Sequence, residues 1–203
     1  MTEASPFNPG VVDWTGDNPG IYLKETAEGP YITLMVYFRI VLSPHGPGNA
    51  MLLLANPQGK GAPAAPNVFV GNNDKLSHYL FDNFCRKFGV FRGAAGMDAV
   101  EFRPLDNVAE RGDGRSYTVD LKSGKDQFTL RWGDLQAPFA ADVLPLRSAT
   151  GQHEMYSCFV ESRDAAISVN GARLKGRPFP RDFMGRPASS AFLAFSETWV
   201  RGA

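Results

Sequence analysis

The sequence predicts an all-β, mainly antiparallel protein, built as a single barrel or closed β-sandwich with one amphipathic helix near residues 73–88 packed on or across it. Three observations predict this class. Residues 31–42 alternate in polarity, an Asn170-Gly171 pair separates two short alternating runs, and the chain of 203 residues contains 21 glycines and 15 prolines, which suits many turns. Period-two alternation is common to sandwiches and barrels, so both architectures stay open.

Residues 1–19 are predicted to form an extended N-terminal segment, followed by a single β-rich domain over residues 20–203. The segment contains three prolines and two glycines and has little apolar periodicity. Phe7, Val11, Val12 and Trp14 are expected to dock it on the domain. Neither a repeat nor a linker composition divides the remaining residues.

Residues 31–42 give the clearest strand. Every even position is apolar, namely Ile32, Leu34, Val36, Phe38, Ile40 and Leu42. The opposite face carries Tyr31, Met35, Tyr37 and Arg39, which mix apolar and polar groups. This alternation indicates a strand with one dry face. The mixed face either lines an internal cavity or meets solvent, and the pattern is consistent with both.

One amphipathic helix is expected to interrupt the strands. Asn72 or Asn73 can cap its start, and Gly89 can end it. Its apolar stripe recurs every four residues and consists of Leu76, Leu80, Phe84 and Phe88, widened by Phe81 and Cys85. Such a stripe is typical of a helix that packs against a sheet or closes one end of a barrel.

Lys87 falls inside this stripe on a helical wheel, while Arg86 lies on the polar side. A lysine in apolar surroundings can lose its proton and form a Schiff base with a carbonyl substrate, so Lys87 is a candidate catalytic residue. The alternative is a lysine in the last helical turn whose charge extends past the core and favours the C-terminus of the helix.

After residue 96 the alternation returns in several short runs. They cover residues 100–102, 117–121, 128–132 and 154–161. Asn170-Gly171 then predicts a two-residue hairpin, because both of its positions tolerate a positive φ. A long apolar strand is predicted from Ala191 to Val200.

Between the hairpin and the last strand lies a loop, residues 176–187, that is rich in proline, arginine and phenylalanine. Its prolines restrict the backbone, so its side chains are expected to be held in place. Arg177, Arg181 and Arg186 carry guanidinium groups that can bind carboxylate or phosphate with two hydrogen bonds. They are therefore candidate ligand-binding residues at the mouth of a cavity. The alternative is surface ion pairing with acidic side chains.

Glu197 is the only charged residue on one predicted face of the last strand. The other residues of that face are Ala191, Leu193, Phe195 and Trp199. A buried carboxylate needs a partner, and an arginine of residues 176–187 is expected to supply it. Desolvation would alternatively raise the pKa of Glu197 and suit it to proton transfer. A third alternative is a frayed strand end that exposes Glu197.

Composition limits the class of partner. The balance of 21 basic and 21 acidic residues argues against nucleic acid and anionic membranes. The longest apolar run is about half the length of a membrane helix, and the N-terminus lacks a secretory signal, so a soluble, cytoplasmic protein is expected. Cys85 and Cys158 are expected to be buried thiols. The three histidines have no metal-ligand spacing, so no metal and no cofactor are expected.

These features favour a protein that binds a small, largely apolar molecule with an anionic group in a cavity of a β-barrel. In this hypothesis Tyr31, Met35, Tyr37 and Arg39 line the cavity, and the three loop arginines lie at its mouth. Glu197 would perform any acid/base chemistry, although no motif demands an enzyme.

The alternative is a structural or interaction subunit. Its contact surface would be residues 176–187, with Phe179 and Phe183 as anchors, because aromatic and arginine side chains dominate interface energetics. The sequence leaves the formation of a homo-oligomer open.

Overall fold

The structure is a computed structural model that describes residues 10–61 and 64–202. Thirteen strands form one mixed sheet, and two more form a small separate sheet. The strands of the large sheet are β1 (Gly10–Asp17), β2 (Gly20–Leu23), β3 (Thr33–Leu42), β4 (Gly48–Leu54), β5 (Val68–Gly71), β6 (Glu101–Pro104), β7 (Asn107–Gly112), β8 (Tyr117–Ser123), β9 (Asp126–Leu135), β10 (Phe139–Val143), β11 (His153–Val169), β12 (Ala172–Arg173) and β15 (Ala191–Gly202). The small sheet pairs β13 (Pro180–Phe183) with β14 (Arg186–Ser189).

The large sheet follows the order β6-β5-β4-β3-β1-β15-β11-β9-β8-β7, with β2 beside β3 and β15, and with β10 and β12 beside β11. Its pairs are antiparallel except for β5 and β6, which run parallel. The two ends of this path, β6 and β7, are separated in the chain by Leu105 and Asp106 alone. The predicted class, mainly antiparallel all-β with one α-helix on the sheet, is confirmed.

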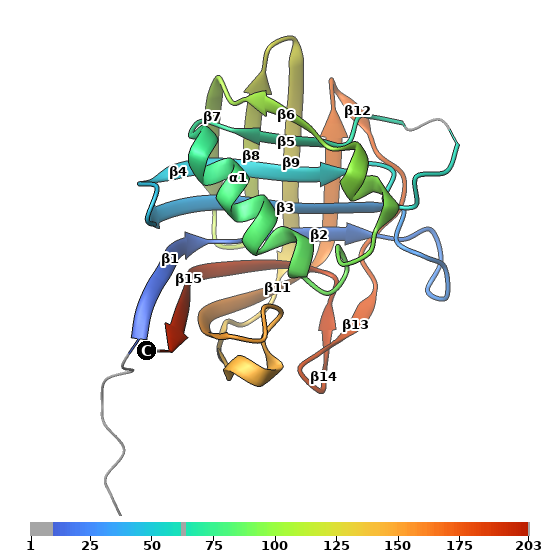
Figure 1. Ribbon diagram of the computed structural model, residues 1–203. Helices are drawn as coiled ribbons and strands as arrows, with labels where there is room; N and C mark the ends of the chain where they lie inside the picture. The colour runs from blue at the N-terminus through green and yellow to red at the C-terminus, as the bar shows by residue number, and fades with distance from the viewer. Residues whose placement is uncertain (1–9, 62–63, 203) are drawn as a thin grey trace, which may run out of the picture.

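The sheet bends so that its two halves pack face to face. In Figure 1 strands β3, β4 and β5 run across strands β7, β8 and β9, which lie behind them. An inner core fills the space between these layers and includes Met35, Tyr37, Leu53, Val119, Leu130, Trp132, Ile167 and Leu193. Both layers therefore bury apolar side chains against each other.

An outer core covers the other face of β3, β4 and β5. It joins Leu34, Val36, Phe38, Leu52 and Phe69 of the sheet to the helical segment and to Trp14, Phe192 and Trp199. Leu34, Val36, Phe38 and Ile40 of β3 thus face the outer core, while Met35 and Tyr37 face the inner core. Leu42, at the end of β3, is exposed. Neither Met35 nor Tyr37 is exposed at all, so the mixed face of β3 meets packed protein at these positions.

Helix α1 (Asp74–Asn83) lies across the strands in Figure 1. The Asn73 side chain caps it by accepting a hydrogen bond from the Leu76 amide at 3.1 Å. The predicted apolar stripe is buried in the outer core, as expected. The α-helix ends earlier than Gly89, because a short 3₁₀ turn, η1 (Cys85–Lys87), takes over. Two further 3₁₀ turns are η2 (Ala95–Ala99) and η3 (Pro145–Arg147).

The predicted hairpin at Asn170-Gly171 is confirmed, since both residues have positive φ, 53° and 81°, between β11 and β12. Residues 176–187, predicted as a loop, instead contain most of the β13–β14 hairpin. Its turn is Met184-Gly185, again with two positive φ values, 54° and 83°. Met184 is not a typical turn residue, so no local pattern marks this hairpin.

The described part of the predicted N-terminal segment is strand β1, which lies between β3 and β15. Residues 1–9 lie outside the described residues. Cys85 is buried as expected, but Cys158 is exposed, because it lies on the outward face of β11. None of the helices in the described ranges has the length and apolarity that crossing a membrane requires.

Candidate functional site

A β-bulge in β15 decides where Glu197 points. Ser196 has a positive φ of 50°, and the pairing with β11 shifts between Cys158–Phe195 and Tyr156–Thr198. Residues before the bulge keep the simple alternation, so Leu193 faces the inner core, whereas Trp199 after it faces the outer core. The prediction that Glu197 and Trp199 share a face with Ala191 and Leu193 is therefore wrong, because the extra residue reverses the alternation.

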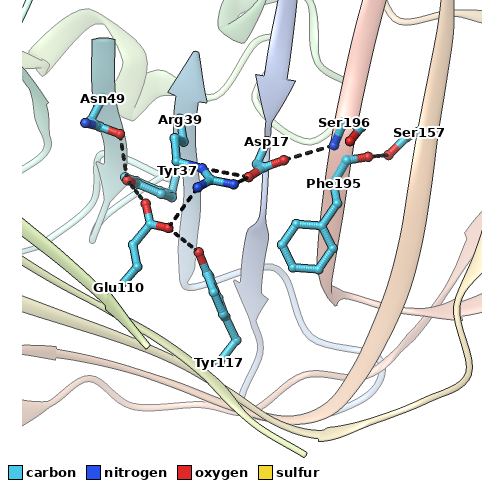
Figure 2. Close-up of polar contacts among 9 residues, drawn as sticks. All are labelled: Asp17, Tyr37, Arg39, Asn49, Glu110, Tyr117, Ser157, Phe195 and Ser196. Atoms are coloured by element: carbon cyan, nitrogen blue, oxygen red, sulfur yellow. Dashed lines mark hydrogen bonds and ion pairs between the residues drawn. The ribbon is translucent and has the colours of Figure 1, made fainter. Parts of the chain in front are cut away.

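Asp17, at the end of β1, binds this bulge from the neighbouring strand (Figure 2). Its Oδ1 accepts a hydrogen bond from the Ser196 amide at 2.9 Å, and its Oδ2 accepts one from Arg39 Nε at 2.8 Å. On the other side of β15, Ser157 Oγ donates to the Phe195 carbonyl at 3.5 Å. The bulge is thus bound from both flanking strands.

On the side of Asp17 away from Ser196, a polar cluster contains two of the residues predicted to line a cavity, Tyr37 and Arg39 (Figure 2). Tyr37 and Tyr117 each donate a hydrogen bond of 2.6 Å to the Glu110 carboxylate, and Arg39 Nη1 lies 3.8 Å from it (Figure 2). Burial raises the pKa of Tyr37 and of Tyr117, and the hydrogen bond to Glu110 raises it further. Tyr37 is therefore engaged in a hydrogen-bond network within the protein. Arg39 connects this network to the surface, because its side chain is half exposed and lines a separate surface pocket with Glu110.

A cavity of about 590 Å³ opens on the outer-core side of β15. Its apolar wall includes Tyr22, Phe88, Val143, Met155, Phe159, Phe183, Phe192 and Trp199, and its polar groups include Asn18, Arg92, Arg147, Arg181 and Glu197. Ligand sites typically have this composition, a mostly apolar wall with a few polar groups that fix orientation. We therefore take this cavity as the candidate site.

Glu197 is the buried carboxyl of the cavity and is only 4% exposed. Its Oε1 accepts hydrogen bonds from Asn18 Nδ2 at 3.0 Å and from Trp199 Nε1 at 2.7 Å. Burial raises the pKa of Glu197 from its ordinary value of 4.5 to about 7; the two hydrogen bonds act in the opposite direction, and the negative charge of Asp17 raises it further. In the described part of the chain no arginine forms an ion pair with Glu197, and the neutral donors of Asn18 and Trp199 bind it instead.

Arg181 supplies the positive charge closest to the aromatic wall. Its guanidinium lies over three rings, at 5.6 Å from the centroid of Tyr22 and 5.1 Å from those of Phe183 and Phe192. Its Nε donates to the Ser189 carbonyl at 3.4 Å. Within the described ranges no carboxylate forms an ion pair with Arg181. Most of its donors are therefore available to a ligand.

The other predicted site residues lie elsewhere. Tyr31 packs edge-on against Tyr22 at 5.9 Å, outside the cavity wall. Arg177 lies over Phe179, and Arg186 lies over Phe139. Lys87 is half-buried in η1 and is not part of the wall, because the change from α to 3₁₀ geometry turns it away from its helical-wheel position. Of the predicted site residues, the cavity thus contains Glu197 and Arg181, whereas Tyr37 and Arg39 meet at Glu110.

Sequence reasoning missed Asn18, Arg92 and Arg147. Asn18 follows β1, where its amide donates to the Ala194 carbonyl at 2.8 Å. Arg92 Nη2 donates to the carbonyls of Lys87 and Ala149 at 2.9 and 2.8 Å, and Arg147 donates to that of Met184. These residues are far apart in the chain, and no spacing rule connects them.

Two further buried ionisable residues, His153 and Asp13, pair with each other next to the cavity wall. His153 Nε2 hydrogen-bonds Asp13, its Nδ1 lies 2.7 Å from Thr150 Oγ1, and its ring packs against Trp199 at 5.9 Å. Arg201 donates to the second Asp13 oxygen at 3.1 Å. In the part of the chain that the structure describes, no group of three or more His, Cys, Asp or Glu side chains could hold a metal ion.

Comparison with known proteins adds no family to this geometry. No protein-family model, no curated protein and no solved structure matches the chain. Any functional conclusion therefore depends on the cavity and its residues.

Proposed function

We propose that this protein binds a small, largely apolar molecule with an anionic group in the cavity between the outer core and the β13–β14 hairpin. The molecule class is the one that the sequence favours, but the position differs. The inner core is filled by side chains such as Met35 and Tyr37, and the outer cavity of about 590 Å³ is the better fit.

The observation that carries the proposal is the setting of Arg181. A guanidinium that has no acidic partner among the described residues, placed over three aromatic rings at a cavity wall, suits a ligand whose anionic group takes two hydrogen bonds while its apolar body contacts the rings. Arg92 and Arg147 add positive charge to the same wall, which also includes the exposed carboxylate of Asp182.

Glu197 gives this site a means of proton transfer. A carboxyl group with a pKa of about 7 is protonated in part of the population at neutral pH and can both donate and accept a proton. Acid/base chemistry on the bound molecule, with Glu197 as the catalytic residue, is therefore the activity that we propose to test after binding.

A pair of fluorescent probes tests the binding proposal. 1-Anilinonaphthalene-8-sulfonate and N-phenyl-1-naphthylamine share one aromatic skeleton, but only the first is anionic. We expect Arg181→Gln to weaken the affinity for the anionic probe by about tenfold, which is the contribution of a charged hydrogen bond. The affinity for the neutral probe should change by less than about twofold. Fluorescence titration at pH 7.5 measures both.

Arg177→Gln is the matched control, because Arg177 is exposed and stacks on Phe179 outside the cavity. This substitution should leave the affinity for both probes unchanged. Equal weakening of both probes by Arg181→Gln, or equal effects of the two arginine substitutions, would reject Arg181 as the anion-binding residue.

The interaction-subunit alternative stays a prediction. Its proposed anchor Phe183 stacks on Phe159 at 4.6 Å and lines the cavity, which favours a role in ligand contact over one in partner contact. The cytoplasmic location expected from the sequence is likewise a prediction.

A further inference from the structure

Two hydrogen-bond acceptors at the polar end of the cavity receive no hydrogen bond from residues 10–61 or 64–202. Asn18 is 5% exposed and lines the cavity; its Nδ2 donates to Glu197, but within these ranges its Oδ1 has no hydrogen-bond partner. On Glu197 both donors, Asn18 and Trp199, reach Oε1. Among the hydrogen bonds of the described residues, none reaches Oε2. Of these two acceptors, Asn18 Oδ1 is the one that is fully buried without a partner among the described residues. A buried acceptor without a donor is costly, and such groups usually have a partner in the functional state.

These acceptors line the same cavity as Arg181. The Arg181 guanidinium lies 5.6 Å from the centroid of the Tyr22 ring, and Tyr22 belongs to the cavity wall together with Asn18 and Glu197. A single ligand in this cavity can therefore contact Arg181 and reach the two acceptors. The apolar wall continues from this point through Phe159, Phe192 and Trp199.

We infer that the ligand is an apolar acid that carries a hydrogen-bond donor, a hydroxyl or an ammonium group, close to its carboxylate. The carboxylate would bind Arg181, the donor would bind Asn18 Oδ1 and Glu197 Oε2, and the apolar body would contact the aromatic wall. Hydroxy acids and amino acids with an aromatic or large aliphatic side chain have this arrangement. This inference rests on the proposed function and specifies its ligand class.

Three probes of one skeleton test the inference. 3-Phenylpropionate has the ring and the carboxylate, 3-phenyllactate adds a hydroxyl beside the carboxylate, and phenylalanine adds an ammonium there. We expect at least one of the last two to bind about tenfold more tightly than 3-phenylpropionate, the contribution of one or two satisfied acceptors. Isothermal titration calorimetry at pH 8, where Glu197 is largely ionised, measures all three.

Two variants assign the preference to the named atoms. In Asn18→Ala, 3-phenyllactate or phenylalanine should bind less than about threefold more tightly than 3-phenylpropionate. The affinity for 3-phenylpropionate itself should stay within about twofold of that of the unsubstituted protein. Glu197→Gln keeps the shape of the side chain but removes its negative charge. It should therefore weaken the binding of phenylalanine most, because the ammonium group loses a charged acceptor. Asn83→Ala, on the exposed face of α1, is the control and should change no probe.

The outcomes separate the two claims. A preference for 3-phenyllactate identifies the donor as a hydroxyl, and a preference for phenylalanine identifies it as an ammonium; both support the inference. Equal binding of all three probes overturns the inference and leaves the proposed function standing. If none of the three binds, the inference fails, and the proposed function fails as well only when the anionic naphthalene probe shows no dependence on Arg181.

Discussion

Replacing Glu197 with glutamine is expected to stabilise the folded protein by about 3 kcal/mol at pH 8 and to have little effect at pH 4. The folded-state pKa of Glu197 is raised from 4.5 to about 7 by burial. Between these values the folded state retains a proton that the unfolded chain has lost, so the free energy of unfolding falls as the pH rises through this window. Above pH 7 the full cost of the buried charge is present. Glutamine never ionises and can still accept the hydrogen bonds from Asn18 and Trp199.

Urea unfolding followed by tryptophan fluorescence at pH 4, 6 and 8 measures this effect. The exposed carboxyl of Glu28 offers the control, since Glu28→Gln should leave the pH dependence of stability unchanged. A Glu197→Gln variant that is less stable than the unsubstituted protein at pH 8 would mean that the ionised carboxylate is stabilised in the fold. In that case Glu197 could not be neutral in part of the population near pH 7.

Replacing Gly16 with alanine is expected to destabilise the protein by about 3 kcal/mol, the upper part of the range for overpacking a well-ordered interior. Gly16 lies in β1 opposite Glu197 on one side and Ile40 on the other. A Cβ at this position would lie inside van der Waals contact with the Arg39 carbonyl oxygen and 2.8 Å from the Ile40 Cα. Both atoms belong to the backbone of β3, so β1 and β3 would have to separate.

Gly202→Ala is the matched strand control. Gly202 lies at the end of β15, and a Cβ there would meet nothing within 4 Å. Its substitution should change the free energy of unfolding by less than about 0.5 kcal/mol, as is usual for surface changes. If Gly16→Ala proved equally mild, the close approach of β1 and β3, and with it the position of Asp17 beside the bulge, would be contradicted.

Local patterns in the sequence were sufficient for the fold class. The alternation in residues 31–42, the helical stripe from Leu76 to Phe88 and the Asn170-Gly171 turn each depend on neighbours in the chain, and each predicted its element. The bend that creates an inner core depends on pairing across the whole sheet. For that reason the mixed face of β3 was assigned to a cavity or solvent, although Met35 and Tyr37 are buried.

The site was only partly accessible to sequence reasoning. Arg181 and Glu197 stood out because a charge interrupted an apolar or proline-rich stretch. Simple alternation assigns Glu197 to the wrong face of β15, because Ser196, a single residue with positive φ, reverses the alternation. Since Ser196 is not a glycine, the sequence does not mark the position of this bulge. Its true partner Asn18 is 179 residues away in the chain, and no local pattern links the two.

The indole N–H of Trp199 reports on the centre of the site most directly, because it donates to Glu197 Oε1 at 2.7 Å. The indole of Trp132 offers an internal reference, since it donates to the Gly20 carbonyl at 3.0 Å and belongs to the inner core. Proton–nitrogen correlation spectra, with the Trp199 signal assigned from a Trp199→Phe variant, can follow both during titration with 3-phenyllactate. We expect a saturable shift of the Trp199 signal with the Trp132 signal unchanged. Equal movement of the two signals, or a Trp199 signal that stays fixed at millimolar ligand while Trp132 moves, would contradict a ligand site at Glu197.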